Sequence, residues 1–193
     1  QDETIFSTCK NTYAGFDNII DCRGFGANKE IENLRPVRGE TVIVKSKNLK
    51  LTQTLRVLNG RHSFYVVPRG ENNFVIGGVQ VESNGPNPTV ESLINILSHA
   101  YRIHMDLRQA EVLSFSSGIR PSFSDNNPKI IIEGSTIRIN GLYRHGFLLA
   151  PLLAEKVGLY FKDDEWAGEM DKYLLTNAPD NAALKKVSDE HFC

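Results

Sequence analysis

The stretch IIDCRGFGAN, residues 19–28, decides how the rest of the chain is interpreted. An apolar pair runs into two glycines, Gly24 and Gly26, which is how a strand enters the glycine-rich turn of a dinucleotide-binding unit. That turn needs a third glycine so that helix and strand can pack closely, and Lys29 stands there instead. Pro36 also interrupts the segment after about two helical turns. We therefore reject a complete dinucleotide clamp and interpret the glycines as a tight exit from a buried strand.

The composition of the 193-residue chain is that of an ordinary soluble globular protein. Apolar residues make up 40% and charged residues 23%, and 22 basic side chains against 23 acidic ones leave a net charge of −1. That balance gives no attraction for nucleic acid or an anionic membrane, and the apolar runs are too short to span a bilayer. Cys9, Cys22 and Cys193 lack metal-binding spacing, so we expect no metal site and a reducing, cytoplasmic location.

The apolar periodicity predicts a chain of mixed α and β structure. Strands are expected at residues 16–22, 40–45, 52–58, 64–67, 74–81, 111–117, 129–133 and 135–140. The turn residues between several of these strands favour antiparallel hairpins. A short helix is expected at 27–34. The tail from Asp163 onward is expected to be helical, with its inner side formed by Trp166, Met170, Leu174 and Leu175.

Two longer helices have recognisable starts. The first follows Thr89, a suitable N-cap, and its predicted inner stripe consists of Val90, Leu93, Ile94, Leu97 and Tyr101. The second is expected to begin near Leu148, because Pro151 is tolerated only in a first helical turn. Backbone amides at such a start can stabilise negative charge. A buried amphipathic helix without a ligand is the alternative.

Several short blocks of the sequence, taken in their order and spacing, form a recognisable pattern. They are IIDCRGFGA (19–27), LRPVRGE (34–40), FYVVPR (64–69) with VIGGVQVE (75–82), and SGIRPSFSDNNP (117–128) with NGLYRHGFLLAP (140–151). In this order and spacing they resemble the C-terminal portion of the D-amino-acid oxidase superfamily of flavoenzymes. The likeness is greatest to its glycine oxidase (ThiO-like) branch, which is associated with thiamine biosynthesis. The opening stretch then matches a late strand of the flavin domain, whose glycines let backbone pass close to FAD.

The resemblance implies an α+β fold of mixed α/β segments. A substrate-binding domain with an antiparallel sheet and helices would occupy residues 36–134. Residues 1–35, a late strand and turn, and residues 135–193, a helix and the C-terminal tail, would belong to a Rossmann-like FAD domain. The family's N-terminal βαβ unit is missing from this sequence. We therefore expect the C-terminal part of an enzyme, inactive and without tight FAD binding alone, and leave open whether the missing segment was cleaved, omitted or never encoded.

The resemblance also implies a reaction. A small, glycine-like amino acid would pass a hydride to FAD, oxygen would be reduced to hydrogen peroxide, and the imine would serve thiazole synthesis. No catalytic acid or base is assigned, because the flavin carries the chemistry. The alternatives are another amino-acid or N-methyl-amine oxidase of the superfamily, or a catalytically silent fragment without flavin. Neither nucleic acid nor a membrane is implied as partner, and a homo-oligomer is left open.

Three residues match the family's substrate-binding positions. Arg120 is the leading carboxylate anchor, because a guanidinium binds a carboxylate in bidentate form. The alternative for Arg120 is a surface ion pair with Asp125. Arg144 would lie on the substrate side of the flavin; otherwise it is an exposed arginine beside a helix. Tyr65 would form an aromatic wall with its hydroxyl near the substrate, and core packing is its alternative.

A second set matches positions that contact the flavin. The set consists of Gly24, Gly118, Tyr143, His145, Gly146, Phe147 and Leu148. The resemblance places the helix that starts near Leu148 against the flavin edge that becomes negative on reduction. At one point the sequence departs from the family, since many relatives carry His where Leu142 stands, and any polar contact at that position is lost.

Overall fold

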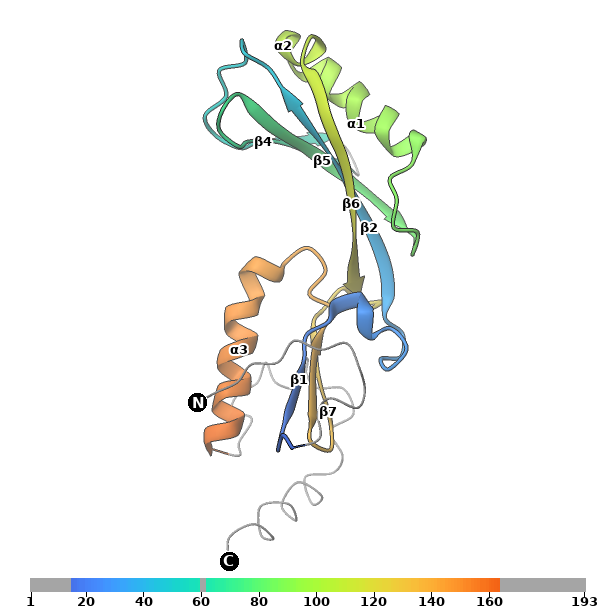
Figure 1. The fold of residues 1–193 in the computed structure, drawn as a ribbon, viewed down its shortest axis with the longest axis vertical. Helices are drawn as coiled ribbons and strands as arrows, with labels where there is room; N and C mark the ends of the chain where they lie inside the picture. The colour runs from blue at the N-terminus through green and yellow to red at the C-terminus, as the bar shows by residue number, and fades with distance from the viewer. Residues whose placement is uncertain (1–14, 60–61, 164–193) are drawn as a thin grey trace, which may run out of the picture. The chain divides into compact units, whose positions relative to one another are not determined.

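The computed structural model describes residues 15–59 and 62–163, which form two compact units (Figure 1). Unit 2 runs from Asn33 to Ser122, and unit 1 combines the chain before it, up to Glu32, with the chain after it, from Phe123. Both helices and strands occur in the described residues, as predicted. The expected helical tail from Asp163, with its inner side chains, lies outside the described residues. None of the described helices is long and apolar enough to cross a membrane.

Unit 2 is built on one antiparallel sheet. Its strands, in spatial order, are β3 (Leu55–Asn59), β4 (His62–Pro68), β5 (Asn73–Glu82), β2 (Arg35–Lys45) and β6 (Glu111–Ser122). The expected hairpin joins β4 to β5, where the Arg69 amide donates to the Asn73 carbonyl at 2.9 Å. Both β2 and β6 are longer than the sequence predicts, so Pro36 and Arg120 both lie within strands.

The helices of unit 2 cover one face of this sheet. They are α1 (Val90–Ile103) and the single turn α2 (Met105–Arg108). Thr89 caps α1 as predicted, because its Oγ1 accepts a hydrogen bond of 3.3 Å from the Ser92 amide. The core between helix and sheet contains Val42, Val44, Phe64, Val66, Phe74, Ile76, Ile96 and Ala100.

The inner stripe predicted for α1 is partly wrong. Val90, Ile94 and Tyr101 are 73%, 61% and 56% exposed, whereas Ile96 and Ala100 are buried. Only the leucines of the predicted stripe pack partly against the core. Helix α1 has apolar residues on more than one side, so the sequence alone does not decide which side is buried. The buried stripe is rotated about the helix axis by roughly a third of a turn from the predicted one.

Unit 1 contains a small mixed sheet and one long helix. Strand β1 (Ile19–Asp21) pairs in parallel with β8 (Thr136–Asn140), which pairs in antiparallel with β7 (Lys129–Glu133). Helix α3 (Gly146–Asp163) packs Leu153 and Val157 against the isoleucines of β7 and β8. Residues 123–134 belong to compact unit 1, whereas the substrate-binding domain implied by the resemblance extends to residue 134.

Two local predictions for unit 1 are wrong. The helix expected at 27–34 is a 3-10 helix over Gly24–Ala27 followed by turns, since Pro36 and its neighbours are drawn into β2. Helix α3 begins at Gly146 rather than near Leu148, and Pro151 lies inside it. Because proline has no N–H, it leaves the Phe147 carbonyl without the usual helical donor.

Candidate functional site

The face of the unit 2 sheet that α1 does not cover carries two of the predicted residues, Tyr65 and Arg120. Side chains alternate along a strand, so Val42 and Val44 point into the core while Thr41 points to the other face. In the strand register, Thr41 stands opposite Gly77 on one side and Ser116 on the other, and Gly77 stands opposite Tyr65. One row across four strands therefore brings these four residues to the same face.

Tyr65 lies across a glycine on its neighbouring strand. A Cβ added to Gly77 would fall under 3.0 Å from the Tyr65 hydroxyl oxygen and 2.9 Å from the Thr41 methyl. Real Cβ atoms do not approach that closely, so only glycine leaves room for the ring. Tyr65 is half-buried and lies outside the hydrophobic core, while its neighbours Phe64 and Val66 lie inside it. The hydroxyl of Tyr65 is thereby held close to the sheet surface.

Arg120 uses a second glycine in the same way. It stands opposite Val37, and its side chain crosses to Gly39, where a Cβ would fall under 3.0 Å from three guanidinium atoms. The guanidinium therefore occupies the space on β2 that a side chain at Gly39 would fill. Its Nη1 is buried and has no hydrogen-bond partner in the described part of the chain. Since an unpaired buried donor costs about 1–3 kcal/mol, this atom is suited to donate a hydrogen bond to a ligand oxygen.

Asp125, the ion-pair partner in the alternative for Arg120, has partners of its own. Asp125 belongs to unit 1, where its carboxylate lies 4.0 Å from Lys129 Nζ and accepts the Asn127 amide at 3.0 Å. That amide, together with Lys129, holds the pKa of the exposed Asp125 below its usual value.

Two hydroxyls on this face were missed by the sequence analysis. Thr41 Oγ1 and Ser116 Oγ lie 2.8 Å apart, in the same row as Tyr65. Gly118 is exposed on β6 opposite Gly39, and a Cβ there would meet nothing within 4 Å. The alternation of polar and apolar residues at 41–42 and 114–118 could have indicated that these hydroxyls share a face. Only the register between β2 and β6 shows that the two hydroxyls lie opposite each other.

The opposite face contrasts with this site, because its buried arginine forms an ion pair and several hydrogen bonds. Arg38 and Glu40 are 4% and 1% exposed, and Arg38 Nε donates to Glu40 Oε1 at 2.8 Å. Arg38 Nη1 donates to Ser83 Oγ and to the Gly85 carbonyl, and Glu40 Oε2 accepts the Thr89 amide. This pair links the start of α1 to β2.

Arg144 and most of the predicted flavin contacts lie in unit 1. Gly24 follows β1, and its carbonyl accepts a 2.8 Å hydrogen bond from Nδ2 of the buried Asn140. Tyr143 has a φ of 50°, a left-handed conformation that is unusual for an aromatic residue. Arg144, which comes next, is exposed. A strained residue immediately before a helix start is a feature of many binding sites.

The start of α3 offers unpaired amides. The amides of Leu148 and Leu149 both donate to the His145 carbonyl, at 3.0 and 2.9 Å. The amides of Gly146 and Phe147 have no backbone acceptor in the described residues, as expected at a helix start. The Phe147 side chain is fully exposed and Leu148 is 74% exposed, so the tip of the helix is open. Such an end suits an oxygen-bearing, electron-rich group.

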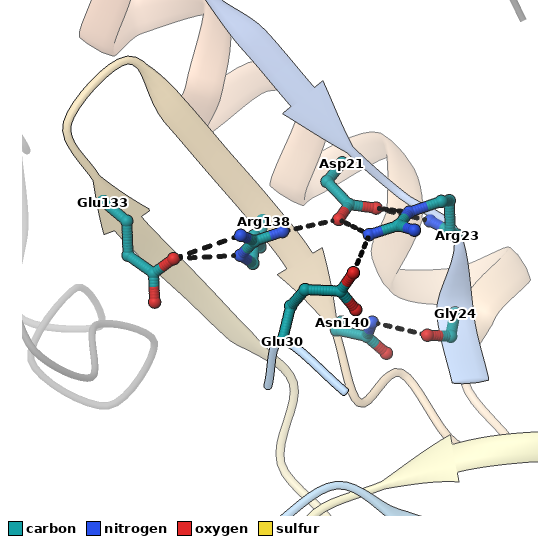
Figure 2. Close-up of polar contacts among 7 residues, drawn as sticks. All are labelled: Asp21, Arg23, Gly24, Glu30, Glu133, Arg138 and Asn140. Atoms are coloured by element: carbon teal, nitrogen blue, oxygen red, sulfur yellow. Dashed lines mark hydrogen bonds and ion pairs between the residues drawn. The ribbon is translucent and has the colours of Figure 1, made fainter. Parts of the chain in front are cut away.

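A network of charges stabilises the small sheet behind this helix (Figure 2). Asp21 on β1 accepts from Arg23 Nη2 at 2.8 Å and from Arg138 Nη1, on β8, at 2.7 Å. Arg138 also reaches Glu133, and Arg23 lies 3.6 Å from Glu30. Burial opposes ionisation of Asp21, but the hydrogen bonds from Arg23, and then from Arg138, outweigh it and lower its pKa. The described residues contain no cluster of His, Cys, Asp and Glu suited to a metal ion.

Comparison with known proteins identifies relatives over most of the chain. The sequence model of one family, described as FAD dependent oxidoreductase (DAO), matches residues 3–158. A putative thiamine biosynthesis oxidoreductase ThiO from Rhizobium etli is 41% identical over 142 residues, which are 73% of this chain and 43% of that protein. A glycine oxidase from Geobacillus kaustophilus is 30% identical over 148 residues, or 73% of this chain and 38% of that protein.

Solved structures give the same result for the fold. The crystal structure of the Geobacillus kaustophilus glycine oxidase is similar with a TM-score of 0.65 and 27% identity, over 80% of this chain and 42% of that one. The glycine oxidase of Bacillus cereus follows with a TM-score of 0.62 and 27% identity, over 75% and 39%. The chain thus spans about two-fifths of the length of the relatives it matches.

Proposed function

Because this chain belongs to the DAO family of FAD-dependent oxidoreductases, we propose that it supplies the substrate-binding sheet and part of the flavin site of a glycine-oxidase-like amino-acid oxidase. The observation that carries the proposal is the buried Nη1 of Arg120, which has no partner in the described residues. A carboxylate from a small amino acid would satisfy this donor. The likeness to ThiO and glycine oxidase supports both the substrate class and a role in making the thiazole of thiamine.

The open face of the sheet does the recognition. Arg120 presents a planar, permanently charged fork that matches the two oxygens of a carboxylate. Because Arg120 lies on strand β6 and its guanidinium occupies the space above Gly39, its position is set by the sheet rather than by a flexible loop. Tyr65, held against Gly77 on the same face, offers a hydroxyl to a polar group of the substrate. We assign Arg144 to the substrate as a second cation.

The residues at the start of α3 fit the cofactor. The two unpaired amides, of Gly146 and Phe147, and the positive end of the helix suit the oxygen-bearing edge of the isoalloxazine ring. By likeness to the family, Gly24, Gly118, Tyr143, His145 and Leu148 complete the contacts. When bound, FAD supplies the acceptor for the hydride that leaves the substrate α-carbon, and oxygen is then reduced to hydrogen peroxide.

The chain's own contribution to catalysis is therefore positioning. Holding the carboxylate fixes where the α-carbon and its hydrogen point, and orientation of this kind accounts for a large part of enzymatic rate enhancement. No residue of the chain needs to act as an acid or base in the hydride step. The substrate loses one hydride and one proton and becomes the imine.

The test uses the complete gene product, purified and assayed for flavin absorbance and for peroxide release with glycine, sarcosine and D-alanine. We expect a yellow protein that oxidises glycine. Arg120→Met should cost about 2–4 kcal/mol of substrate binding, seen mainly as a higher KM. Arg69→Met, at an exposed turn of the same sheet, is the control and should leave KM unchanged.

Each of the other outcomes has a definite meaning. A colourless protein that takes up no FAD would overturn the proposal in favour of a silent relative. Preference for sarcosine or another N-methyl amine over glycine would keep the flavoenzyme and replace its substrate. An unchanged KM in Arg120→Met would remove this residue from substrate binding.

A further inference from the structure

The open face of the unit 2 sheet has a bare patch of backbone beside the Arg120 guanidinium. Gly118 lies on β6 between Ser116 and Arg120, and the three positions share one face because side chains alternate along a strand. A Cβ added to Gly118 would meet nothing within 4 Å. Gly118 also stands opposite Gly39, where the guanidinium of Arg120 lies. A small molecule bound to this guanidinium therefore has room above Gly118.

A pair of hydroxyls borders this patch on the side away from Arg120. Thr41 on β2 and Ser116 on β6 stand opposite each other in the strand register, and their hydroxyl oxygens lie 2.8 Å apart. The Thr41 methyl faces the other way, since a Cβ added to Gly77 on β5 would lie 2.9 Å from it. The hydrogen bond between the hydroxyls is exposed, so a ligand can reach both oxygens.

The chemistry of this hydroxyl pair favours a group that donates hydrogen bonds. Each hydroxyl has one hydrogen and two lone pairs, and the bond between them uses one hydrogen and one lone pair, which leaves more acceptor sites than donors. A carboxylate only accepts, whereas the N–H groups of an amine donate. By accepting these hydrogens, the pair would leave free the nitrogen lone pair, which becomes part of the imine double bond.

The spacing between the hydroxyl pair and the guanidinium fits an α-amino acid. Thr41 and Ser116 lie two residues along their strands from Gly39 and Gly118, a separation of roughly 7 Å. A glycine molecule with a hydrogen bond of about 3 Å at its carboxylate and another at its nitrogen spans roughly 8 Å between the two protein groups. One molecule can therefore reach both.

We propose that the Thr41–Ser116 hydroxyl pair binds the amino group of the substrate whose carboxylate is held by Arg120. This inference rests on the proposed function and adds the residues that recognise the amine. Two attachment points fix the direction of the α-carbon more closely than the carboxylate alone does. Acetate has the carboxylate of glycine but no amino group, so it would use Arg120 without the hydroxyl pair.

The test compares glycine with acetate on the complete gene product, through the KM for glycine and the Ki of acetate as a competitive inhibitor. Thr41→Val and Ser116→Ala should each raise the KM about fivefold and leave the Ki unchanged, because each removes one hydrogen bond to the amine. Thr41→Ser keeps the hydroxyl and should retain the wild-type KM. Arg120→Met should raise both constants, because it removes the carboxylate anchor.

The matched control is Ser114→Ala. Ser114 lies on the same face of β6 but one row further from Arg120, opposite Ile43, so its loss should change neither constant. An unchanged KM in Thr41→Val and Ser116→Ala would overturn the inference. A parallel rise of the KM for glycine and the Ki of acetate would overturn it as well, because the hydroxyls would then act through the carboxylate or through Arg120. A wild-type protein that oxidises no amino acid would instead overturn the proposed function, and this inference with it.

Discussion

Substituting Gly39 by alanine tests whether the position of the Arg120 guanidinium beside Gly39 matters for binding. The side chain would add a single methyl group to β2, and that methyl would fall under 3.0 Å from three guanidinium atoms. Gly39 does not adopt a positive φ, so alanine is compatible with the backbone. Alanine in a strand is favoured over glycine by roughly 0.5–1 kcal/mol, and the variant should therefore fold at least as well as the wild type.

The size of the effect follows from this geometry. To reach an ordinary van der Waals separation, the guanidinium must move by roughly 1 Å or more, and a displacement of that size can cost about a hundredfold in rate. We therefore expect kcat/KM for glycine to fall about 10²-fold, a loss of about 2.7 kcal/mol of transition-state stabilisation. The charge of Arg120 is retained, so the loss would come from its orientation alone.

The assay is a double-mutant cycle on the complete gene product, with peroxide release as the readout. Without the guanidinium, the methyl group has nothing to displace, so Gly39→Ala should have no further effect once Arg120 is Ala. The coupling energy should then equal nearly the whole cost of the single variant. Additive losses, or full activity in Gly39→Ala, would refute the reasoning.

Three further outcomes are expected. In urea unfolding of the 193-residue chain, Arg38→Met should lower the free energy of unfolding by about 3–5 kcal/mol, because it leaves the buried Glu40 carboxylate without its ion-pair partner. Arg120→Met should instead raise the free energy of unfolding by about 1 kcal/mol, because it removes an unpaired buried donor. A lower free energy of unfolding in Arg120→Met would contradict this reasoning. The pKa of Asp21 is lowered in the folded chain, so on acidification the unfolded state binds a proton at a higher pH than the folded state does. The stability that ionised Asp21 provides is therefore present above about pH 4 and is lost as the pH falls further. Asp21→Asn should lower the free energy of unfolding at neutral pH and weaken its dependence on pH in the acid range. Unfolding free energies measured at several pH values would show both effects. Gly118→Ala should not destabilise unit 2, because a methyl group there meets nothing within 4 Å and alanine is favoured over glycine in a strand. Flavin titration of the complete gene product should show weaker binding if this backbone contacts FAD.

Much of the fold could be predicted from local patterns. Thr89 was predicted to cap α1, and the turn residues at 69–73 predicted a hairpin, because caps and turns depend on side chains within a few residues of each other. Recognition of the family also came from the sequence, through the quoted blocks, and the comparisons confirm the family. These signals need no knowledge of what packs against them.

The errors occurred where a segment had two acceptable partners. Helix α1 has apolar residues on more than one side, and the sheet buried Ile96 and Ala100 rather than Val90 and Ile94. Pro36 was interpreted as the end of a helix, but pairing with β6 made it part of a strand. The choice in each case depends on residues distant in sequence.

The sequence by itself determined the family, the α and β content, and Arg120 and Tyr65 as candidates. Only the tertiary structure decided that Gly39 and Gly77 lie beneath these side chains, and that Thr41 faces Ser116. The physical reason is strand register: side chains on neighbouring strands meet through backbone pairing, and a shift of one residue would send each of them to the opposite face.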